Sequence, residues 1–262
     1  MITIKNETIS GIPTLHVVQD EKREQGELPA VFFLHGYTSA KEHNLAIAYL
    51  LAEKGFRVFL LMRFITESEK GISQGRSEIC FFWEVVLTSI QDLNKLKEHY
   101  SEQKLIDLNR VGVSGTSMGA ITTYGALTQY KWIQSAVCFM GAAYFQKLAH
   151  EQMNQLEQKG IVLEEEAKAD VLAKIRPFDL SYQVEKLNQR PLLIWHGKQD
   201  KVVPFAFSEE LYHDIQPHYQ DTPQWLEFSI EERSGHKVPR QAILEAVSWF
   251  EAHLLTKRRR VS

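Results

Sequence analysis

The 262-residue chain has only two cysteines, and neither has a second cysteine at metal-ligand spacing. Cys80 and Cys138 each lie inside an apolar run, so we expect small buried side chains rather than disulfide or zinc ligands. The sequence also has no HExxH motif, no cluster of cysteine and histidine and no acidic ion-binding loop. These absences predict a protein that needs neither a metal nor a cofactor.

Long hydrophobic runs and an excess of one charge are also missing. No apolar run is long enough to span a bilayer, and the N-terminus lacks a basic region followed by an apolar one. The net charge is −3 with both signs mixed, and we interpret the basic residues 257–260 as a solvated tail. We therefore expect a cytoplasmic protein without a nucleic-acid or membrane partner. Whether it is a monomer or a homodimer stays open.

What the chain does have is an alternation of apolar runs and helical patterns. Residues 2–19 predict an edge hairpin. Continuous apolar runs predict buried strands, and amphipathic segments between them predict helices, with Ser39 as the cap of the first helix. The length fits one domain over residues 1–262. The expected strands are 29–34, 56–61, 110–114, 135–140, 191–195 and 225–230, and the expected helices are 40–54, 78–100, 120–127, 205–215 and 239–254. The alternation predicts an α/β fold with a mostly parallel, twisted sheet and helices on both faces.

Residues 144–189 differ from the rest because they contain no apolar strand pattern. Strong helix formers of both charges dominate 151–174 and predict a helix there, with enough apolar residues for one buried face. We interpret residues 144–189 as a small helical cap inserted between two strands and folded over the catalytic edge. An enlarged connecting helix on the outer face of the sheet is the alternative.

The residues Gly115-Thr-Ser-Met-Gly119 lie between an expected buried strand and an expected apolar helix. A G-x-S-x-G sequence at a strand–turn–helix junction is typical of a nucleophile elbow, in which the serine side chain projects above the sheet. A chance glycine-rich turn is the alternative. The context favours Ser117 as a nucleophile.

A serine nucleophile needs a base to take its proton and an acid to hold that base. In sheets of this kind the three residues follow in the order serine, acid, histidine, each after a strand. Of the five later aspartates, only Asp200 directly follows an expected buried strand, whereas Asp170, Asp179, Asp214 and Asp221 do not. His236 lies in a loop between the last strand and the last helix, and His253 lies within that helix. We therefore predict Ser117, Asp200 and His236 as the catalytic residues.

The oxyanion of the acyl-transfer intermediate needs hydrogen-bond donors. We expect them to be the backbone N–H of Met118, directly after the nucleophile, and that of Tyr37. His35 and His196 each precede a glycine at a strand end, and we expect them to shape turns through structural hydrogen bonds. No role is assigned to His16, His43, His99, His150, His213 and His218.

These motifs together resemble the α/β-hydrolase superfamily, in particular the bacterial YitV-like esterases, which are close to the dienelactone-hydrolase and prolyl-oligopeptidase-like families. The resemblance runs through His35–Asn44, Gly115–Gly119, His196–Phe205 and Gly235–Pro239. It implies an α/β-hydrolase fold and the same three catalytic residues. One departure concerns residues 62–75, which lack the Pro-Asp and His-Gly that relatives often carry after this strand, so the mouth of the site is expected to differ in shape.

The leading hypothesis is a serine esterase that cleaves small carboxylic esters through an acyl-enzyme. A peptidase or a thioesterase could use the same three residues. A non-catalytic binding module on a hydrolase scaffold is a further alternative, but such modules usually lose one of the three residues. Fold analogy cannot separate these activities, so the choice among them must rest on the geometry and chemistry of the site.

Overall fold

The apolar runs of the sequence form the strands of one sheet in the computed structural model, which describes residues 1–61 and 78–255. Within these residues the sheet has eight strands in the order β1-β2-β4-β3-β5-β6-β7-β8. β1 and β2 form the expected antiparallel hairpin, β2 pairs antiparallel with β4, and all other neighbours are parallel. The predicted α/β class with a mostly parallel sheet is confirmed. The strands are β1 (Ile2–Ile9), β2 (Ile12–Gln19), β3 (Leu28–Leu34), β4 (Arg57–Leu61), β5 (Ile106–Thr116), β6 (Ser135–Phe139), β7 (Leu192–Gly197) and β8 (Leu226–Glu231).

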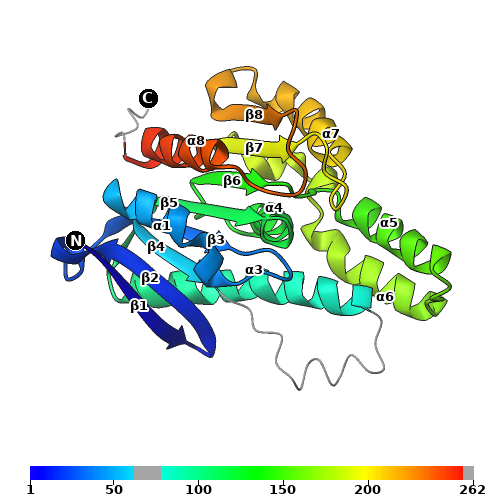
Figure 1. Ribbon diagram of the computed structural model, residues 1–262, viewed down its shortest axis with the longest axis horizontal. Coiled ribbons are helices and arrows are strands. Elements are labelled where there is room, and N and C mark those ends of the chain that lie inside the picture. The colour runs from blue at the N-terminus through cyan, green and yellow to red at the C-terminus, as the bar shows by residue number, and fades with distance from the viewer. Residues whose placement is uncertain (62–77, 256–262) are drawn as a thin grey trace.

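Helices cover both faces of this sheet, as the alternating pattern predicted (Figure 1). The α-helices are α1 (Leu45–Glu53), α3 (Glu78–Glu102), α4 (Met118–Gln129), α5 (Phe145–Gln158), α6 (Glu165–Ile175), α7 (Ala206–Ile215) and α8 (Arg240–Phe250). A π-helical turn, Glu251–Leu255, extends α8. Side chains alternate along the strands between two cores. Phe32 and Phe59 face a core with α3, α4, α5 and α7, whereas Val31 and Val58 face a core with α1 and α8.

The beginning of the first helix differs from the prediction. Residues Lys41–Asn44 form a 3₁₀ turn, and α1 begins only at Leu45. Ser39 does not cap either element, because Ala40 is extended and the Ser39 hydroxyl lies 3.2 Å from Nδ1 of His43. The expected capping role of Ser39 is therefore wrong.

The predicted helix over 151–174 is two helices. α5 ends at Gln158, Gly160 has a φ of +79°, and α6 starts at Glu165. Glycine takes this left-handed backbone conformation without the steric cost that a Cβ imposes, and it commonly ends helices. In Figure 1, α5 and α6 lie on the side toward which the arrowheads of the central parallel strands point.

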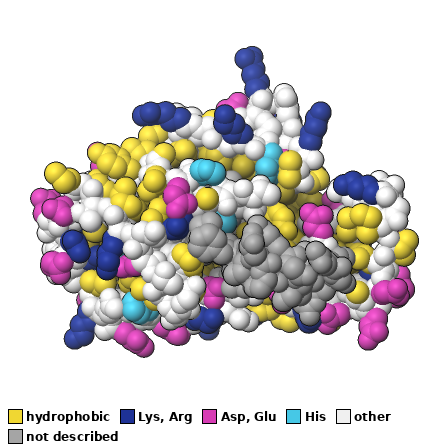
Figure 2. All heavy atoms as spheres, turned by 60° about the horizontal axis from the view of Figure 1, so that its bottom comes forward, with side chains coloured by type: hydrophobic (Ala, Val, Ile, Leu, Met, Phe, Trp, Pro, Cys, Tyr) yellow, Lys and Arg dark blue, Asp and Glu magenta, His cyan; other side chains and the backbone are white. Residues whose placement is uncertain are grey.

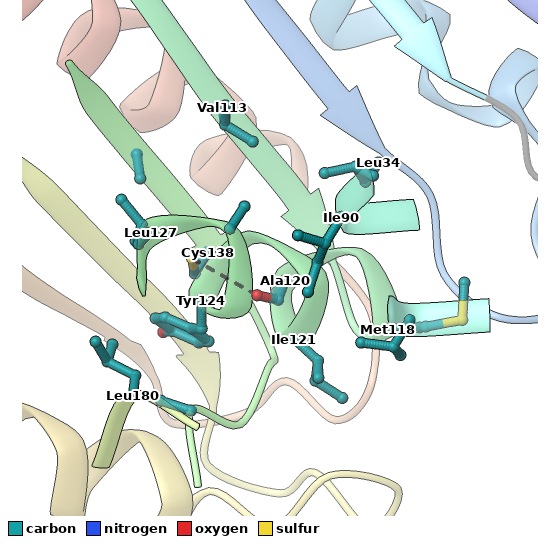
Figure 3. Packing of buried hydrophobic residues seen from close by; sticks show 14 of the residues in the cluster. Leu34, Ile90, Val113, Met118, Ala120, Ile121, Tyr124, Leu127, Cys138 and Leu180 are labelled. Carbon is teal, nitrogen blue, oxygen red and sulfur yellow. Dashed lines mark hydrogen bonds between the residues drawn. The ribbon is translucent and has the colours of Figure 1, made fainter. Parts of the chain in front are cut away.

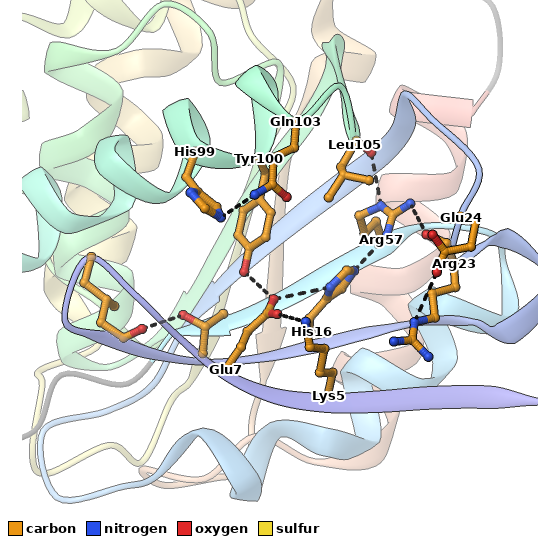
Figure 4. A network of polar contacts seen from close by, with 12 residues as sticks. Lys5, Glu7, His16, Arg23, Glu24, Arg57, His99, Tyr100, Gln103 and Leu105 are labelled. Atoms are coloured by element: carbon orange, nitrogen blue, oxygen red, sulfur yellow. Dashed lines mark hydrogen bonds and ion pairs between the residues drawn. The ribbon is translucent and has the colours of Figure 1, made fainter.

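The hairpin is attached to the sheet by a buried polar network (Figure 4). Arg57 is fully buried and donates to Nε2 of His16 at 2.9 Å and to the Leu105 and Gln25 carbonyl oxygens. An arginine can only donate, so the proton of His16 is on Nδ1, which faces Glu7 at 3.4 Å. Tyr100 of α3 donates to the same Glu7 oxygen at 2.7 Å. His16, to which the sequence pattern assigned no role, thus connects the hairpin to the sheet.

Other sequence expectations have mixed outcomes. Neither cysteine forms a disulfide, and Cys138 is buried, but Cys80 on α3 is only half-buried. The divergent residues 62–75 and the basic residues 257–260 lie outside the described residues. Acidic and basic side chains are both spread over the face in Figure 2, as the small net charge predicts. Over residues 1–61 and 78–255, no helix combines the length and apolarity that a membrane crossing needs.

Candidate active site

Ser117 occupies the sharp turn that joins β5 to α4. Its φ of 56° and ψ of −116° lie outside the backbone regions that serine normally adopts, as expected of a residue at a nucleophile elbow. The backbone N–H of Ser117 donates to the Phe139 carbonyl at 2.8 Å, which fixes the turn to β6. Behind the turn, α4 packs apolar side chains, among them Ile121 and Tyr124, into the core (Figure 3).

Two glycines make this turn possible because the backbones approach too closely for a side chain. A Cβ on Gly119 would lie 2.1 Å from the Leu34 carbonyl oxygen, and one on Gly115 would lie 2.2 Å from the Gly119 carbonyl carbon. The end of β3 is thereby held against the elbow. A Cβ on Gly36 would lie 3.6 Å from the Ser117 Cβ, so the loop after β3 passes directly beside the serine.

His236 reaches Ser117 from the loop between β8 and α8. Its Nε2 lies 3.0 Å from the Ser117 hydroxyl oxygen, and its Nδ1 lies 2.6 Å from Oδ2 of Asp200. An ionised carboxylate only accepts hydrogen bonds, so Nδ1 carries the proton and Nε2 presents a lone pair to the serine hydroxyl. The structure therefore brings together the three residues that the sequence order selected.

Asp200 is placed by the turn that follows β7, and its side chain is fully buried. Its Oδ1 accepts from the backbone N–H groups of Val202 at 2.8 Å and Val203 at 3.0 Å. Burial alone would raise the pKa of Asp200, but hydrogen bonds from His196, His236 and the Val202 N–H outweigh it and hold the pKa well below its usual range. The carboxylate is thus ionised and fixed in orientation.

The loop that carries His236 is held against the end of β7. A Cβ on Gly197 would lie 2.5 Å from the Ser234 carbonyl oxygen, and the Gln199 N–H donates to that carbonyl at 3.0 Å. The loop can approach this closely only because position 197 is glycine. This contact sets His236 between Asp200 and Ser117.

His196 has a further contact that the sequence pattern did not indicate. Its Nε2 lies 3.0 Å from the Val203 carbonyl and 3.3 Å from Oδ2 of Asp200, and its Nδ1 lies 2.7 Å from the Ser208 hydroxyl. The Val203 carbonyl only accepts, so Nε2 carries the proton and Nδ1 accepts from Ser208. His196 therefore forms the expected structural hydrogen bonds, and it also supports Asp200. His35 donates from Nδ1 to the Gly36 carbonyl at 2.7 Å, as a turn-shaping residue would.

The predicted oxyanion donors belong to two segments that lie beside Ser117, namely the start of α4 and the loop after β3. The Met118 N–H belongs to the first turn of α4, where a helix offers no acceptor to its own N–H groups. Tyr37 follows Gly36 in the loop beside Ser117. Among the described residues, no group of three or more His, Cys, Asp or Glu side chains has the arrangement of a metal site.

Two cavities open on Ser117. The first, of about 280 Å³, is lined by side chains from α3, α4 and α5 and by Val203 and Pro204, and we name it the α5 pocket. The second, of about 730 Å³, lies toward α1 and the His236 loop, and we name it the α1 pocket. Tyr37, Ser117 and Val202 line both, and His236 lines only the α1 pocket. Ser117 thus lies at the junction of two cavities that differ in volume and lining.

Comparisons with known proteins place this geometry in a family. The chain is 46% identical to the proposed esterase YitV of Bacillus subtilis over 97% of this chain and the whole of that protein. It is 28% identical to the esterase YjfP of Escherichia coli over the same share of this chain and the whole of that protein. The solved structure of TT1662 from Thermus thermophilus has a TM-score of 0.75 at 20% identity, covering 97% of this chain and 98% of the other, which shows the α/β-hydrolase fold. Residues 87–256, more than half of the chain, match the model of the prolyl oligopeptidase family. The chain is therefore a hydrolase-fold enzyme that belongs to the prolyl oligopeptidase family.

Proposed function

We propose that this protein is a serine esterase that cleaves small carboxylic esters with Ser117 as the nucleophile. The observation that carries the proposal is the continuous hydrogen-bonded chain from Ser117 through His236 to Asp200. The two curated relatives named above as esterases, which align over 97% of this chain, support an ester as substrate.

The geometry supports a two-step mechanism. The Ser117 hydroxyl transfers its proton to Nε2 of His236 while its oxygen attacks the ester carbonyl carbon. The tetrahedral oxyanion accepts hydrogen bonds from the backbone N–H groups of Met118 and Tyr37, each worth about 3 kcal/mol in such sites. The carbonyl re-forms, the bond to the alcohol oxygen breaks, and Nε2 returns its proton to that oxygen. Water then repeats the sequence on the acyl-enzyme and releases the acid.

Asp200 acts on the base and not on the substrate. It keeps the His236 proton on Nδ1 and stabilises the imidazolium that forms when Nε2 takes the serine proton. Its four donors, two from imidazole rings and two from the backbone, keep it ionised throughout. No metal or cofactor has a part in the proposed steps.

Residues 144–189 enter the proposal as a partial cap. One face of α5, including Leu148, Gln152 and Leu156, lines the α5 pocket beside Ser117. The same helix buries Phe145 and Met153 in the core, so it also belongs to the packing of the domain. We propose that α5 closes one side of the site, whereas α6 supports α5 from outside.

The test is covalent labelling followed by a substrate panel. A fluorophosphonate probe should label the parent protein at Ser117, and Ser117→Ala should abolish labelling and ester hydrolysis. Nitrophenyl esters should be turned over at least a hundredfold faster than the matching aminoacyl nitroanilides, and thioesters would be compared in the same assay. Preferential cleavage of the anilides would favour the peptidase alternative, and a protein without labelling or turnover would contradict a serine mechanism.

A further inference from the structure

We propose that the α5 pocket binds the acyl chain of the substrate and that the α1 pocket binds its alcohol, so that this enzyme prefers esters of an aliphatic acid with a larger alcohol. The inference rests on the proposed function and assigns a chemical class to each half of its substrate. It starts from the position of His236 relative to the two cavities.

The position of the general acid decides which cavity receives the leaving group. The group that protonates the alcohol oxygen must lie within hydrogen-bond reach of that oxygen. Nε2 of His236, 3.0 Å from the Ser117 oxygen, is that group, and His236 lines the α1 pocket and not the α5 pocket. The alcohol therefore leaves through the α1 pocket, and the acyl chain, bonded to the opposite side of the carbonyl carbon, extends into the α5 pocket.

The lining of the α5 pocket fits an aliphatic chain. Apolar side chains come from three helices and from the loop after β7, which are far apart in the sequence. The polar lining groups are Glu78, Gln155 and Lys159, which are exposed, and Glu151 and Gln152, which are half-buried on α5. Burying apolar surface there is favourable by roughly 0.8 kcal/mol for each methylene group. The apolar lining consists of Ile79, Phe82, Ile121, Leu148, Leu156, Val203 and Pro204.

The α1 pocket suits a different group. Its volume of about 730 Å³ exceeds that of the α5 pocket, and its wall mixes apolar side chains such as Val238 and Ile243 with polar ones. His43, Asn44 and Lys237 supply polar groups that can hydrogen-bond hydroxyl groups of an alcohol. A bulky alcohol therefore fills this cavity better than methanol or ethanol.

The experiment fills each pocket separately. Leu156→Trp narrows the α5 pocket at a half-buried position, and Val238→Trp narrows the α1 pocket at another. Asn154→Trp is the matched control, because Asn154 is exposed on the same helix and lines neither pocket. Each protein is assayed with nitrophenyl esters from acetate to dodecanoate and with butyrate esters of methanol, glycerol and naphthol.

The two selectivity ratios should respond independently. Leu156→Trp should lower the octanoate-to-acetate ratio of kcat/KM at least tenfold and leave the naphthyl-to-methyl butyrate ratio within twofold. Val238→Trp should lower the naphthyl-to-methyl butyrate ratio at least tenfold and leave the octanoate-to-acetate ratio within twofold. Asn154→Trp should change neither ratio. If Leu156→Trp or Val238→Trp does not fold, Gln155→Trp or Lys237→Trp replaces it at an exposed position of the same wall.

The opposite pattern would overturn the assignment. If Leu156→Trp changed the alcohol ratio and spared the acyl ratio, the two pockets would have the reverse roles. Ratios unchanged in both variants of an active enzyme would show that neither pocket holds the substrate. A parent protein without ester turnover or probe labelling would instead overturn the proposed esterase function, and the pocket assignment with it.

Discussion

The imidazole of His196 lies 3.3 Å from the same Asp200 oxygen, Oδ2, to which His236 donates. Both the His196 and the Asp200 side chains are fully buried, so this contact is shielded from water. Ser208 completes the arrangement because its hydroxyl lies 2.7 Å from Nδ1 of His196 and holds the tautomer whose Nε2 carries the proton. Asp200 is thus held by a second histidine, which lines neither the α5 pocket nor the α1 pocket.

A first prediction concerns this support. His196→Ala should lower kcat/KM by about ten- to a hundredfold with little change in KM, because a hydrogen bond to a charged group contributes roughly 1.5–3 kcal/mol. His196→Gln, which retains an N–H donor, should recover part of the loss. Steady-state kinetics of both variants test this. Equal losses of kcat/KM in His196→Ala and His196→Gln would indicate a packing role only.

A second prediction concerns the interdependence of the nucleophile and the base. Ser117→Ala should reduce kcat by several orders of magnitude, and adding His236→Ala to it should reduce kcat by less than threefold further, because the residues act as one unit. Asp200→Asn should be severe but less complete. Single and double variants would be compared on the fastest ester of the panel. Full additivity of the two alanine substitutions would contradict a shared proton-transfer step.

A third prediction compares two reasons why a position requires glycine, namely a clash of the added Cβ and a left-handed backbone conformation. Gly119→Ala should destabilise the protein by about 3 kcal/mol or more, because its Cβ would lie 2.1 Å from the Leu34 carbonyl oxygen, and backbone atoms cannot move aside cheaply. Gly160→Ala is the matched control. A Cβ at position 160 would meet no atom, and the only obstacle is the left-handed backbone with a φ of +79°. Gly160→Ala should therefore lower the free energy of unfolding by about 1–2 kcal/mol. Urea unfolding of both variants measures the difference, and equal losses would contradict the close approach at the elbow.

A fourth prediction concerns stability at acidic pH. Burial and the Arg57 cation lower the pKa of His16 from 6.5 to about 4, so the unfolded chain binds this proton more readily than the folded protein. The free energy of unfolding should therefore fall as the pH drops from about 6.5 to about 4, by on the order of 3 kcal/mol, and this contribution should be constant above pH 6.5. Urea midpoints measured across this range test the slope.

The control variant keeps the hydrogen bonds of residue 16 but has no titratable side chain at that position. His16→Gln offers one acceptor to Arg57 and one donor to Glu7, so the loss between pH 6.5 and 4 should become shallower. His213→Gln, at an exposed position on α7, should leave the slope unchanged. The same slope in His16→Gln as in the parent would show that other groups cause the acid sensitivity.

The strands and the meeting of three residues at one edge of the sheet could be predicted from the sequence, because both depend on local order along the chain. Continuous apolar runs mark buried strands, and the parallel sheet brings their carboxyl ends to one edge, where Ser117, Asp200 and His236 meet. The roles of His16 and His196 could not be predicted in this way. Each depends on a group that only the folded chain brings near, namely Arg57 from β4 and Ser208 from α7. No spacing rule relates these partners.

The errors also have local physical causes. Ser39 has the residue type of a helix cap, but the extended backbone of Ala40 delays the helix by several residues. The helix over 151–174 was predicted as one element because its composition is uniform, although Gly160 provided a signal for the break. The two pockets could not be predicted from the sequence, because their walls combine elements from distant parts of the chain.

The docking of the His236 loop on Gly197 has a consequence for biosynthesis. Ser117 and His236 are 119 positions apart, and a ribosome makes the elbow long before the histidine. β8 and its loop must emerge and settle against β7 before any base reaches the serine. Under the proposed mechanism, a growing chain therefore carries an inert hydroxyl at its elbow, and reactivity begins only when β8 has joined the sheet.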